Sequence, residues 1–300
     1  MVAREVAVEV PATSANLGPG FDSLGVALDW TLRLDFRLSD EPVAPPHDPS
    51  PARAARAAQL LYDRAALPQP AGIEVTYESD LPVGRGLGIS AAARVGGLLA
   101  ADSLIGSELD PEMLLPLAVQ LERHADNAVP AMFGGLRVIV ETDEGAGVTH
   151  LGVELPEELQ LVLLIPAFSM PTEETRRRLP ERLTRNQAVH NIGRAALLLA
   201  ALQARRYDLL QIATEDVIHQ PARATIFEPM YQIFQAARDA GAHGVYLSGG
   251  GPTIAAMATE RFEEIAGAMR AAAATRGVEA STRICALRTT GAEVLSTDGS

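Results

Sequence analysis

Apolar and polar residues alternate in several short stretches of the chain, and a period of two is typical of half-buried β-strands. In the clearest case Val6, Val8 and Val10 alternate with Ala7 and Glu9, before prolines and glycines begin a loop. The first half therefore has predicted strands at residues 6–10, 24–38, 73–77 and 136–140. In the second half, the continuous apolar run 161–165 predicts a strand that is buried on both faces, and shorter strands are expected at 244–247 and 253–257.

Longer apolar stretches, many of them rich in alanine, indicate helices between these strands. We expect helices at residues 52–66, 90–104, 111–123, 187–202, 230–240 and 262–276. Strands and helices mixed in this way predict an α+β architecture in both halves, although the strand order in the sheets does not follow from the pattern.

One segment has no periodicity at all. Residues 142–158 shift to Asp, Glu, Gly and Thr, which is typical of a domain boundary. A chain of 300 residues is also long enough for two domains of about 150 residues each. We therefore expect one domain at residues 1–155 and a second at 156–300.

The amino-acid composition disfavours or excludes several classes of function. With 25 basic and 38 acidic residues the net charge is −13, which disfavours binding to nucleic acid or to an anionic membrane surface. Every basic residue is arginine, so a Walker-type nucleotide loop, which requires lysine, is excluded. The single cysteine, Cys285, excludes an intrachain disulfide and a cysteine-rich metal site. The apolar runs are short and the first residues do not resemble a signal peptide, so a cytoplasmic protein is expected.

The sequence LPVGRGLGISAAA places three glycines, Gly84, Gly86 and Gly88, before Ser90 and a predicted helix. Glycine lets a ligand approach the backbone closely, and a helix N-terminus offers unpaired N–H groups. This segment therefore predicts an anion site, most plausibly for phosphate. A simple tight turn with Ser90 as the N-cap explains the pattern equally well.

The sequence LERHADNAVPAMFGGL gathers Glu122, His124, Asp126 and Asn127 within six positions. A transition-metal site using His124 and Asp126 is conceivable, but no second histidine or cysteine lies nearby to complete it. Glu122 fits Mg²⁺ better, because Mg²⁺ uses few protein carboxylates and takes its other ligands from phosphates and water.

Two further groups of polar residues suggest a substrate pocket. In PATSANLGPGFDSLG, Asp22 could hold an ammonium group with Asn16 orienting it, although an Asx-type turn is the simpler interpretation. Arg176 and Arg223 can each grip a carboxylate with two hydrogen bonds if they face the cleft, whereas arginine is more often a surface charge. The turn at residues 248–251 either closes a packed hairpin or offers N–H groups to the substrate.

Six motifs occur in one order along residues 6–257: PATSANLGPGFDSLG, LPVGRGLGISAAA, ERHADNAVPAMFGG, PTEETRRRLP, HQPAR and LSGGGPT. In this arrangement the chain resembles the GHMP family of small-molecule kinases, and within it the branch that acts on L-homoserine. The resemblance implies an N-terminal domain like domain 2 of ribosomal protein S5, a ferredoxin-like C-terminal domain and an active site between them. It implies ATP and Mg²⁺ as cofactors and leaves a homodimer open.

The resemblance also implies where the cofactors bind. Ser90 and Glu122 would hold Mg²⁺, and ATP would lie on the glycine loop. The positions that match the ATP-binding motif are Pro82, Gly84, Arg85, Gly86, Leu87, Gly88, Ile89, Ser90, Ala91 and Ala92.

The remaining roles implied by the resemblance concern the substrate. Asn16 and Asp22 would bind its amine, Arg176 and Arg223 its carboxylate, and His124 and Asn127 would place its hydroxyl. Thr172 would lie near the transferred phosphoryl group, and Asp126 is a candidate for the catalytic carboxylate. The catalytic positions are thus Asp126, Asn127 and Thr172.

The chain departs from the family pattern at three places. Ile89 replaces a usual serine of the phosphate loop, Arg123 replaces a usual glycine, and no asparagine begins the helix near Pro51. Two alternative functions stay open. One is a GHMP kinase for mevalonate, shikimate or a sugar, and the other is a weakly active relative that binds nucleotide in a regulatory role.

Overall fold

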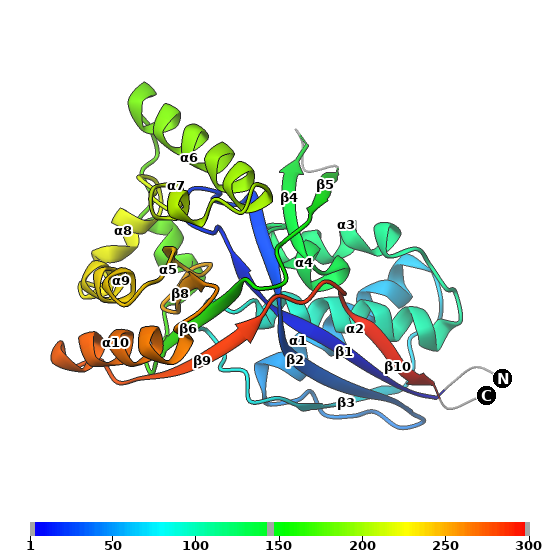
Figure 1. Ribbon diagram of the computed structural model, residues 1–300. Helices are drawn as coiled ribbons and strands as arrows, with labels where there is room; N and C mark the ends of the chain where they lie inside the picture. The colour runs from blue at the N-terminus through cyan, green and yellow to red at the C-terminus, as the bar shows by residue number, and fades with distance from the viewer. Residues whose placement is uncertain (1–3, 143–146, 298–300) are drawn as a thin grey trace.

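The computed structural model describes residues 4–142 and 147–297, which form two antiparallel sheets covered by helices (Figure 1). The larger sheet has six strands in the order β10-β1-β2-β4-β5, with β3 paired to β2 beside this path. Its strands are β1 (Glu5–Ala15), β2 (Leu24–Ser39), β3 (Gly72–Glu78), β4 (Leu136–Glu141), β5 (Val148–Val153) and β10 (Glu293–Thr297).

Strand β2 is long enough to serve two neighbours on the same edge. Its first residues, from Leu24 to Val26, pair with β4, whereas its last seven pair with β3. In the second stretch Leu32, Leu34 and Phe36 are buried and the residues between them point outward. The predicted alternation is therefore confirmed here.

Helices cover one face of this sheet (Figure 1). They are α1 (Pro49–Arg64), α2 (Ile89–Ile105), α3 (Pro111–Glu122) and α4 (Ala128–Phe133). The Asp48 and Asp110 carboxylates accept hydrogen bonds from the first turns of α1 and α3, which fixes where these two helices begin. Helix α2 packs against β1 and between the other helices, so its alanine-rich sequence is buried along most of its length.

The second sheet has four strands in the order β7-β8-β6-β9. Its strands are β6 (Gln160–Pro166), β7 (Gly244–Leu247), β8 (Ile254–Ala258) and β9 (Ala280–Ala286). Its helices are α5 (Thr172–Arg177), α6 (Arg185–Gln203), α7 (Leu210–Ala213), α8 (Gln220–Ala224), α9 (Met230–Asp239) and α10 (Phe262–Thr275). Helices separate β6 from β7 and β8 from β9, which gives the split βαβ order of a ferredoxin-like domain.

The second sheet is buried on both faces, as the apolar run in β6 predicted. Leu161 and Leu163 belong to the core that continues from the first sheet, whereas Val162 and Leu164 pack in a separate cluster with residues of α9 and α10. The two halves therefore share an apolar core, and groups at their junction are held on rigid elements.

Three strands did not show in the apolar pattern. β9 is an edge strand of the second sheet in which only Cys285 is buried. β5 lies within residues 142–158, which were expected to be irregular; it is an edge strand with many exposed side chains and so has no apolar stripe. β10 pairs with β1, so the end of the chain returns to the first sheet although it lies in the segment 156–300. Apart from this strand, the division at 155/156 stays a proposal. Among the helices of the described residues, none combines the length and apolar character that a membrane crossing needs.

Helix α3 ends at Arg123, which adopts a left-handed conformation with φ of 70°. This conformation explains why glycine suits the position, since a side chain there costs about 1 kcal/mol or more. We expect Arg123→Gly to raise the free energy of unfolding by about 0.5–1 kcal/mol in denaturant titrations. Arg276→Gly is the control, because Arg276 ends α10 with φ of −107° and gains no relief. A loss of stability in Arg123→Gly equal to that in the control contradicts this explanation.

Candidate active site

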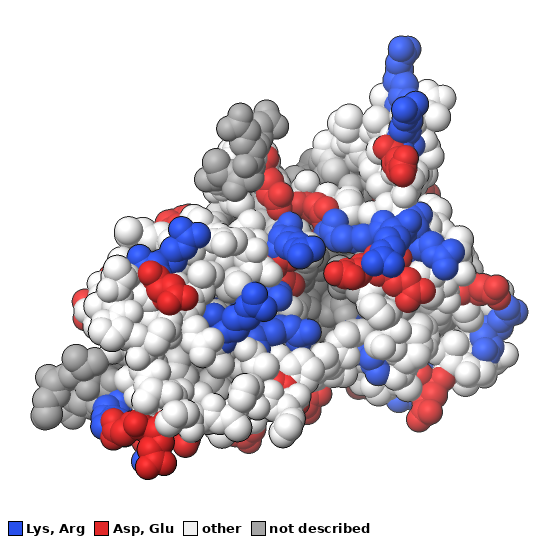
Figure 2. Space-filling model, turned by 180° about the vertical axis from the view of Figure 1, so that it is seen from behind, with Lys and Arg blue, Asp and Glu red and all other residues white. Residues whose placement is uncertain are grey.

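A pocket with about 600 Å³ of empty space opens where the two halves meet. Figure 2 shows a hollow in the middle of one face of the molecule, with arginine side chains on its rim and acidic side chains among them. The pocket is lined by Asn16, Asp22, Gly84, Arg85, Gly86, Leu87, Gly88, Ile89, Ser90, Glu122, His124, Asp126, Asn127, Arg176, Arg223, Gly249 and Gly250. Residues from all six motifs therefore line one pocket.

Four of the expected site residues are not among those that line this pocket. Ala91 and Ala92 are buried in the first turns of α2 and do not line the pocket. Pro82 lines a neighbouring cavity, next to Arg85. Thr172 is the first residue of α5, and its side chain lies outside the described part of the structure.

The glycine loop needs its glycines for packing as well as for an anion. Gly88 is the N-cap of α2 with φ of 66°, and a Cβ there would lie 1.8 Å from the Thr13 hydroxyl oxygen. At Gly86 a Cβ would lie 2.3 Å from the Ser248 carbonyl oxygen. Ser90 is inside the helix and is not its N-cap, so that simpler interpretation of the serine is wrong. The N-terminus of α2 faces the pocket, where its first N–H groups suit a phosphate.

The turn at 248–251 holds the glycine loop from the other half of the chain. The Ser248 hydroxyl donates a 2.7 Å hydrogen bond to the Gly86 carbonyl, and the Thr253 N–H donates to the Arg85 carbonyl at 3.2 Å. The turn joins β7 to β8, so it is a packed hairpin, and its glycines also line the pocket. The packed hairpin is therefore confirmed, and a contact of the turn's N–H groups with a substrate stays a prediction.

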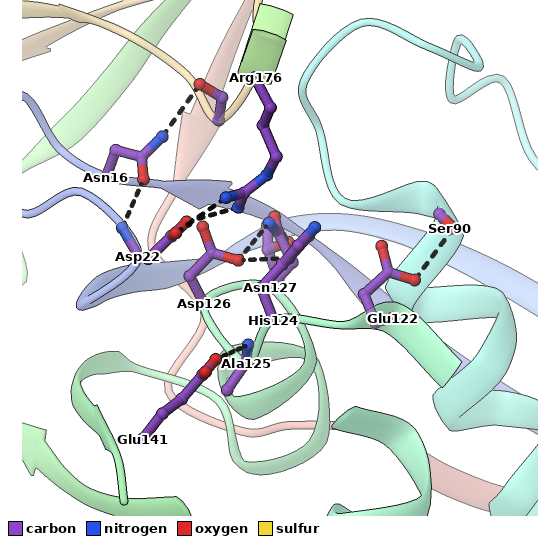
Figure 3. A network of polar contacts seen from close by, with 12 residues as sticks. Asn16, Asp22, Ser90, Glu122, His124, Ala125, Asp126, Asn127, Glu141 and Arg176 are labelled. Atoms are coloured by element: carbon purple, nitrogen blue, oxygen red, sulfur yellow. Dashed lines mark hydrogen bonds and ion pairs between the residues drawn. The ribbon is translucent and has the colours of Figure 1, made fainter. Parts of the chain in front are cut away.

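Ser90 and Glu122 come together from α2 and α3. The Ser90 hydroxyl donates to Glu122 Oε2 at 3.1 Å (Figure 3). One hydroxyl and one carboxylate fit a Mg²⁺ ion that takes its other ligands from nucleotide phosphates and water. Within residues 4–142 and 147–297, no group of three or more His, Cys, Asp or Glu side chains is placed to hold a metal ion. The same two side chains also contact Arg94, which is ion-paired with Glu122.

His124, Asp126 and Asn127 form a hydrogen-bonded group at the start of α4 (Figure 3). Asp126 Oδ1 accepts from His124 Nδ1 at 2.9 Å and from Asn127 Nδ2 at 3.1 Å. Burial pushes the pKa of Asp126 upward, but these hydrogen bonds and the charge of Arg176 outweigh it, and the net pKa is lowered. An ionised Asp126 accepts from Nδ1 of His124, so Nε2 is the ring nitrogen left for a ligand.

Asp22 and Arg176 form a two-pronged ion pair across the pocket (Figure 3). The two guanidinium Nη atoms donate to the two Asp22 carboxylate oxygens at 2.9 and 2.6 Å. Asn16 accepts from the Asp22 N–H at 3.0 Å and donates to the Gly249 carbonyl at 3.0 Å. The hydrogen bond from the Asp22 N–H spans six residues, whereas an Asx-type turn spans two, so Asn16 positions the Asp22 backbone by a different contact from the simpler interpretation.

Arg223 is 1% exposed, so it is not the surface charge that arginine usually is. Its Nη1 contacts His219 Nδ1 at 2.7 Å and donates to the Gly249 carbonyl at 2.9 Å. In the described part of the structure its buried Nε has no hydrogen-bond partner, and no ion pair joins it to a carboxylate. Burial and the nearby charge of Arg176 lower the pKa of Arg223 to about 10, so it stays charged at neutral pH and suits an incoming anion.

The residues that hold Arg223 were not found from the sequence. The buried Asp216 carboxylate accepts from the N–H groups of His219 and Gln220 at the start of α8, and from Asn191 of α6 at 2.7 Å. Burial lowers the pKa of His219 to about 4, so this ring is neutral and accepts from Arg223 through Nδ1. The signal was present in the dense polar sequence TEDVIHQPAR, where Asp216 lies three and four residues before His219 and Gln220, the spacing by which a side chain caps the start of a helix.

Comparison with known families settles what this pocket belongs to. The description "GHMP kinases N terminal domain" matches residues 52–135, and "GHMP kinases C terminal" matches residues 198–275. The chain is a GHMP kinase. This kinase has the two-domain α+β fold expected from its motifs.

The kinase is similar over its length to enzymes named homoserine kinase. It is 38% identical to the one of Moorella thermoacetica over 96% of this chain and 99% of that one. It is 39% identical to the one of Carboxydothermus hydrogenoformans over 85% and 86% of the two chains. The crystal structure of homoserine kinase from Cytophaga hutchinsonii matches with a TM-score of 0.87, 28% identity and 98% coverage of both chains. A mevalonate kinase of L. major shares the fold, with a TM-score of 0.68 at 14% identity.

Proposed function

We propose that this kinase transfers the terminal phosphoryl group of ATP to the side-chain hydroxyl of L-homoserine, forming O-phospho-L-homoserine for threonine biosynthesis. The observation that carries the proposal is the distribution of charge along one pocket. Arg176 contacts the same Phe21 ring as Arg223 and is paired with Asp22, and Ser90 in the first turn of α2 stands on the other side of the site (Figure 3). A small substrate with a carboxylate, an amine and a hydroxyl matches this arrangement, as do the relatives named homoserine kinase.

The cationic end offers more donors than the protein uses. Arg223 has a buried Nε without a partner in the described structure, and Arg176 likewise has an unpartnered buried Nε. A substrate carboxylate between the two guanidinium groups would pair with both. The ammonium group of the same substrate would bind the Asp22 carboxylate, which also pairs with Arg176. The guanidinium carbons of Arg176 and Arg223 lie 5.3 and 5.6 Å from the centroid of the Phe21 ring, so one aromatic ring contacts both cations.

The centre of the pocket would position the hydroxyl. His124 Nε2 and the Asn127 amide stand beside the glycine loop, and Thr13 fixes the amide by donating to Asn127 Oδ1 at 2.8 Å. When bound, Mg²⁺ supplies charge neutralisation on the transferred phosphoryl group, and Ser90 and Glu122 would hold it. Phosphoryl transfer depends mainly on alignment and charge, so these groups need little covalent chemistry.

The ionisation of Asp126 bears on its catalytic role. Its lowered pKa makes it a weak base, so we infer that it orients His124 and Asn127 more than it removes a proton. Asp126→Asn is expected to lower kcat about 10- to 100-fold, less than the loss of up to about 10⁴-fold for a true general base. Above about pH 5 the wild-type profile should show no inflection from this group, because its pKa lies below the usual value near 4. Full loss of turnover with a shifted profile would assign Asp126 the role of base.

The alternative substrates fit the charges less well. A substrate without an amine, such as mevalonate or shikimate, leaves Asp22 without an ammonium partner, and a neutral sugar leaves both arginines without an anion. The presence of Ser90, Glu122 and Asn127 in the pocket speaks against a purely regulatory relative. Net charge and composition also support a cytoplasmic enzyme without a nucleic-acid partner.

The test is ADP release by the purified protein with ATP and Mg²⁺, using L-homoserine, mevalonate, shikimate, galactose and L-threonine in separate assays. We expect turnover with homoserine and at least about 100-fold lower kcat/KM with each of the others. Faster turnover with another alcohol would keep the phosphate site and overturn the substrate. Nucleotide binding without turnover on any of them would favour the regulatory alternative.

A further inference from the structure

Arg94 contacts both side chains that were assigned to the cation, and no motif pointed to it. It stands on α2 one turn after Ser90 and is ion-paired with Glu122 of α3. Arg94 Nη1 also donates a 2.7 Å hydrogen bond to Ser90 Oγ. One guanidinium nitrogen therefore contacts the two oxygens that a divalent cation would need.

The hydrogen bonds leave little room for a cation beside Arg94. The Ser90 hydroxyl gives its hydrogen to Glu122 Oε2 and accepts from Arg94 Nη1, and the same Glu122 oxygen is the one in the ion pair. The side chain of Glu122 is only 10% exposed and that of Arg94 22%, so water screens their attraction weakly. A cation that binds Ser90 and Glu122 has to replace this nitrogen.

Resting on the proposed function, we propose that Arg94 competes with the divalent cation for Ser90 Oγ and Glu122 Oε2. Arg94 thereby sets how strongly the cation assists nucleotide binding. The positive charges of Arg53, Arg56 and Arg123 lie near Arg94 and oppose its attraction to Glu122. The phosphates of a nucleotide that arrives with the cation bring negative charge to these arginines. This charge compensates Arg94 for the loss of its contact with Glu122 when the cation takes its place.

The test measures binding and not turnover. ADP is titrated by calorimetry into wild type and Arg94→Met, in saturating Mn²⁺ and separately in EDTA. The ratio of the dissociation constant in EDTA to that in Mn²⁺ gives the contribution of the cation to ADP binding. We expect Arg94→Met to raise this ratio about tenfold, because Glu122 no longer has to be freed from a charge, and to leave ADP affinity in EDTA within about twofold of wild type. Arg56→Met is the matched control, since it removes a nearby exposed charge that does not contact Ser90 or Glu122.

Two outcomes overturn the proposal. An unchanged or smaller ratio in Arg94→Met shows that the guanidinium does not compete with the cation, and weaker ADP binding in EDTA shows that it binds phosphate directly. Arg94→Lys keeps the charge without the planar fork and serves as the second variant if Arg94→Met fails to fold. The expected result is then an increase of less than about threefold in the ratio of dissociation constants, and a decrease in that ratio contradicts the proposal.

Glu122→Gln separates this proposal from the one on which it rests. If Glu122→Gln lowers the ratio and abolishes the effect of Arg94→Met in the double variant, the competition acts through Glu122. If Glu122→Gln leaves the ratio unchanged, the cation site itself is wrong, and the proposal about Arg94 is overturned with it. An unchanged ratio in Arg94→Met alone, with the Glu122→Gln effect present, overturns the competition and leaves the cation site standing.

Discussion

Arg223→Met is expected to lower kcat/KM for L-homoserine about 1,000-fold, or roughly 4 kcal/mol, since a buried charge pair with the substrate carboxylate is lost. The stability should change little. The buried guanidinium is costly without a carboxylate partner, so its removal offsets the loss of its contacts with His219 and the Gly249 carbonyl. We expect the free energy of unfolding to stay within about 1 kcal/mol of wild type.

Steady-state kinetics and denaturant titration together check this prediction. Arg177→Met is the matched control: Arg177 lies on α5 beside Arg176, but its side chain is 80% exposed, so its removal should leave kcat/KM within about twofold. A large loss of stability in Arg223→Met would mean that Arg223 holds the fold. A small loss of activity would mean that the substrate carboxylate binds elsewhere.

Asp22→Asn is expected to lower kcat/KM about 100-fold, mainly by raising KM, because the carboxylate that would accept the substrate ammonium becomes neutral. The change also leaves Arg176 without its ion-pair partner. Burial lowers the pKa of Arg176 and Asp22 raises it, and the variant loses the contribution of Asp22. The side chains of Asp22 and Arg176 are about a third exposed, so water compensates part of this loss and the fold should persist.

The kinetic check compares two substrates on one variant. An alcohol that lacks the amine, such as γ-hydroxybutyrate, should be turned over slowly by wild type and no more slowly by Asp22→Asn, because it has no ammonium group to lose. Asp35→Asn, on the exposed part of β2, serves as the control. Equal losses on both substrates would show that Asp22 acts by holding Arg176 and not by binding the amine.

The fold could be predicted where the signal is local. The alternation in β2, the double-sided burial of β6 and the glycines before α2 each follow from neighbours in the sequence, and each was found in the structure. β5, β9 and β10 were missed because they are edge strands in which few of the described side chains are buried, so they carry no apolar stripe. Pairing of β10 with β1 joins the two ends of the chain, which no local pattern reports.

The candidate site shows the same limit. Its residues were found because motifs mark them, but their partners depend on contacts across the chain. The pair of Asp22 with Arg176 joins positions 154 residues apart, and Arg94 meets Glu122 only because α2 packs against α3. Arg94 looked like an ordinary residue of a helix in the sequence, and only its contacts with Ser90 and Glu122 distinguish it.

One competition reaction tests most directly whether this kinase selects L-homoserine. Equal concentrations of L-homoserine, γ-hydroxybutyrate, aminopropanol and mevalonate are mixed with the kinase, Mg²⁺ and a limiting amount of ATP, and the phosphate esters are identified by phosphorus NMR and mass spectrometry. Since both the amine and the carboxylate should be recognised, O-phosphohomoserine is predicted as the dominant product. Comparable phosphorylation of the compound that lacks the amine or of the one that lacks the carboxylate, or preferential phosphorylation of mevalonate, would contradict the account.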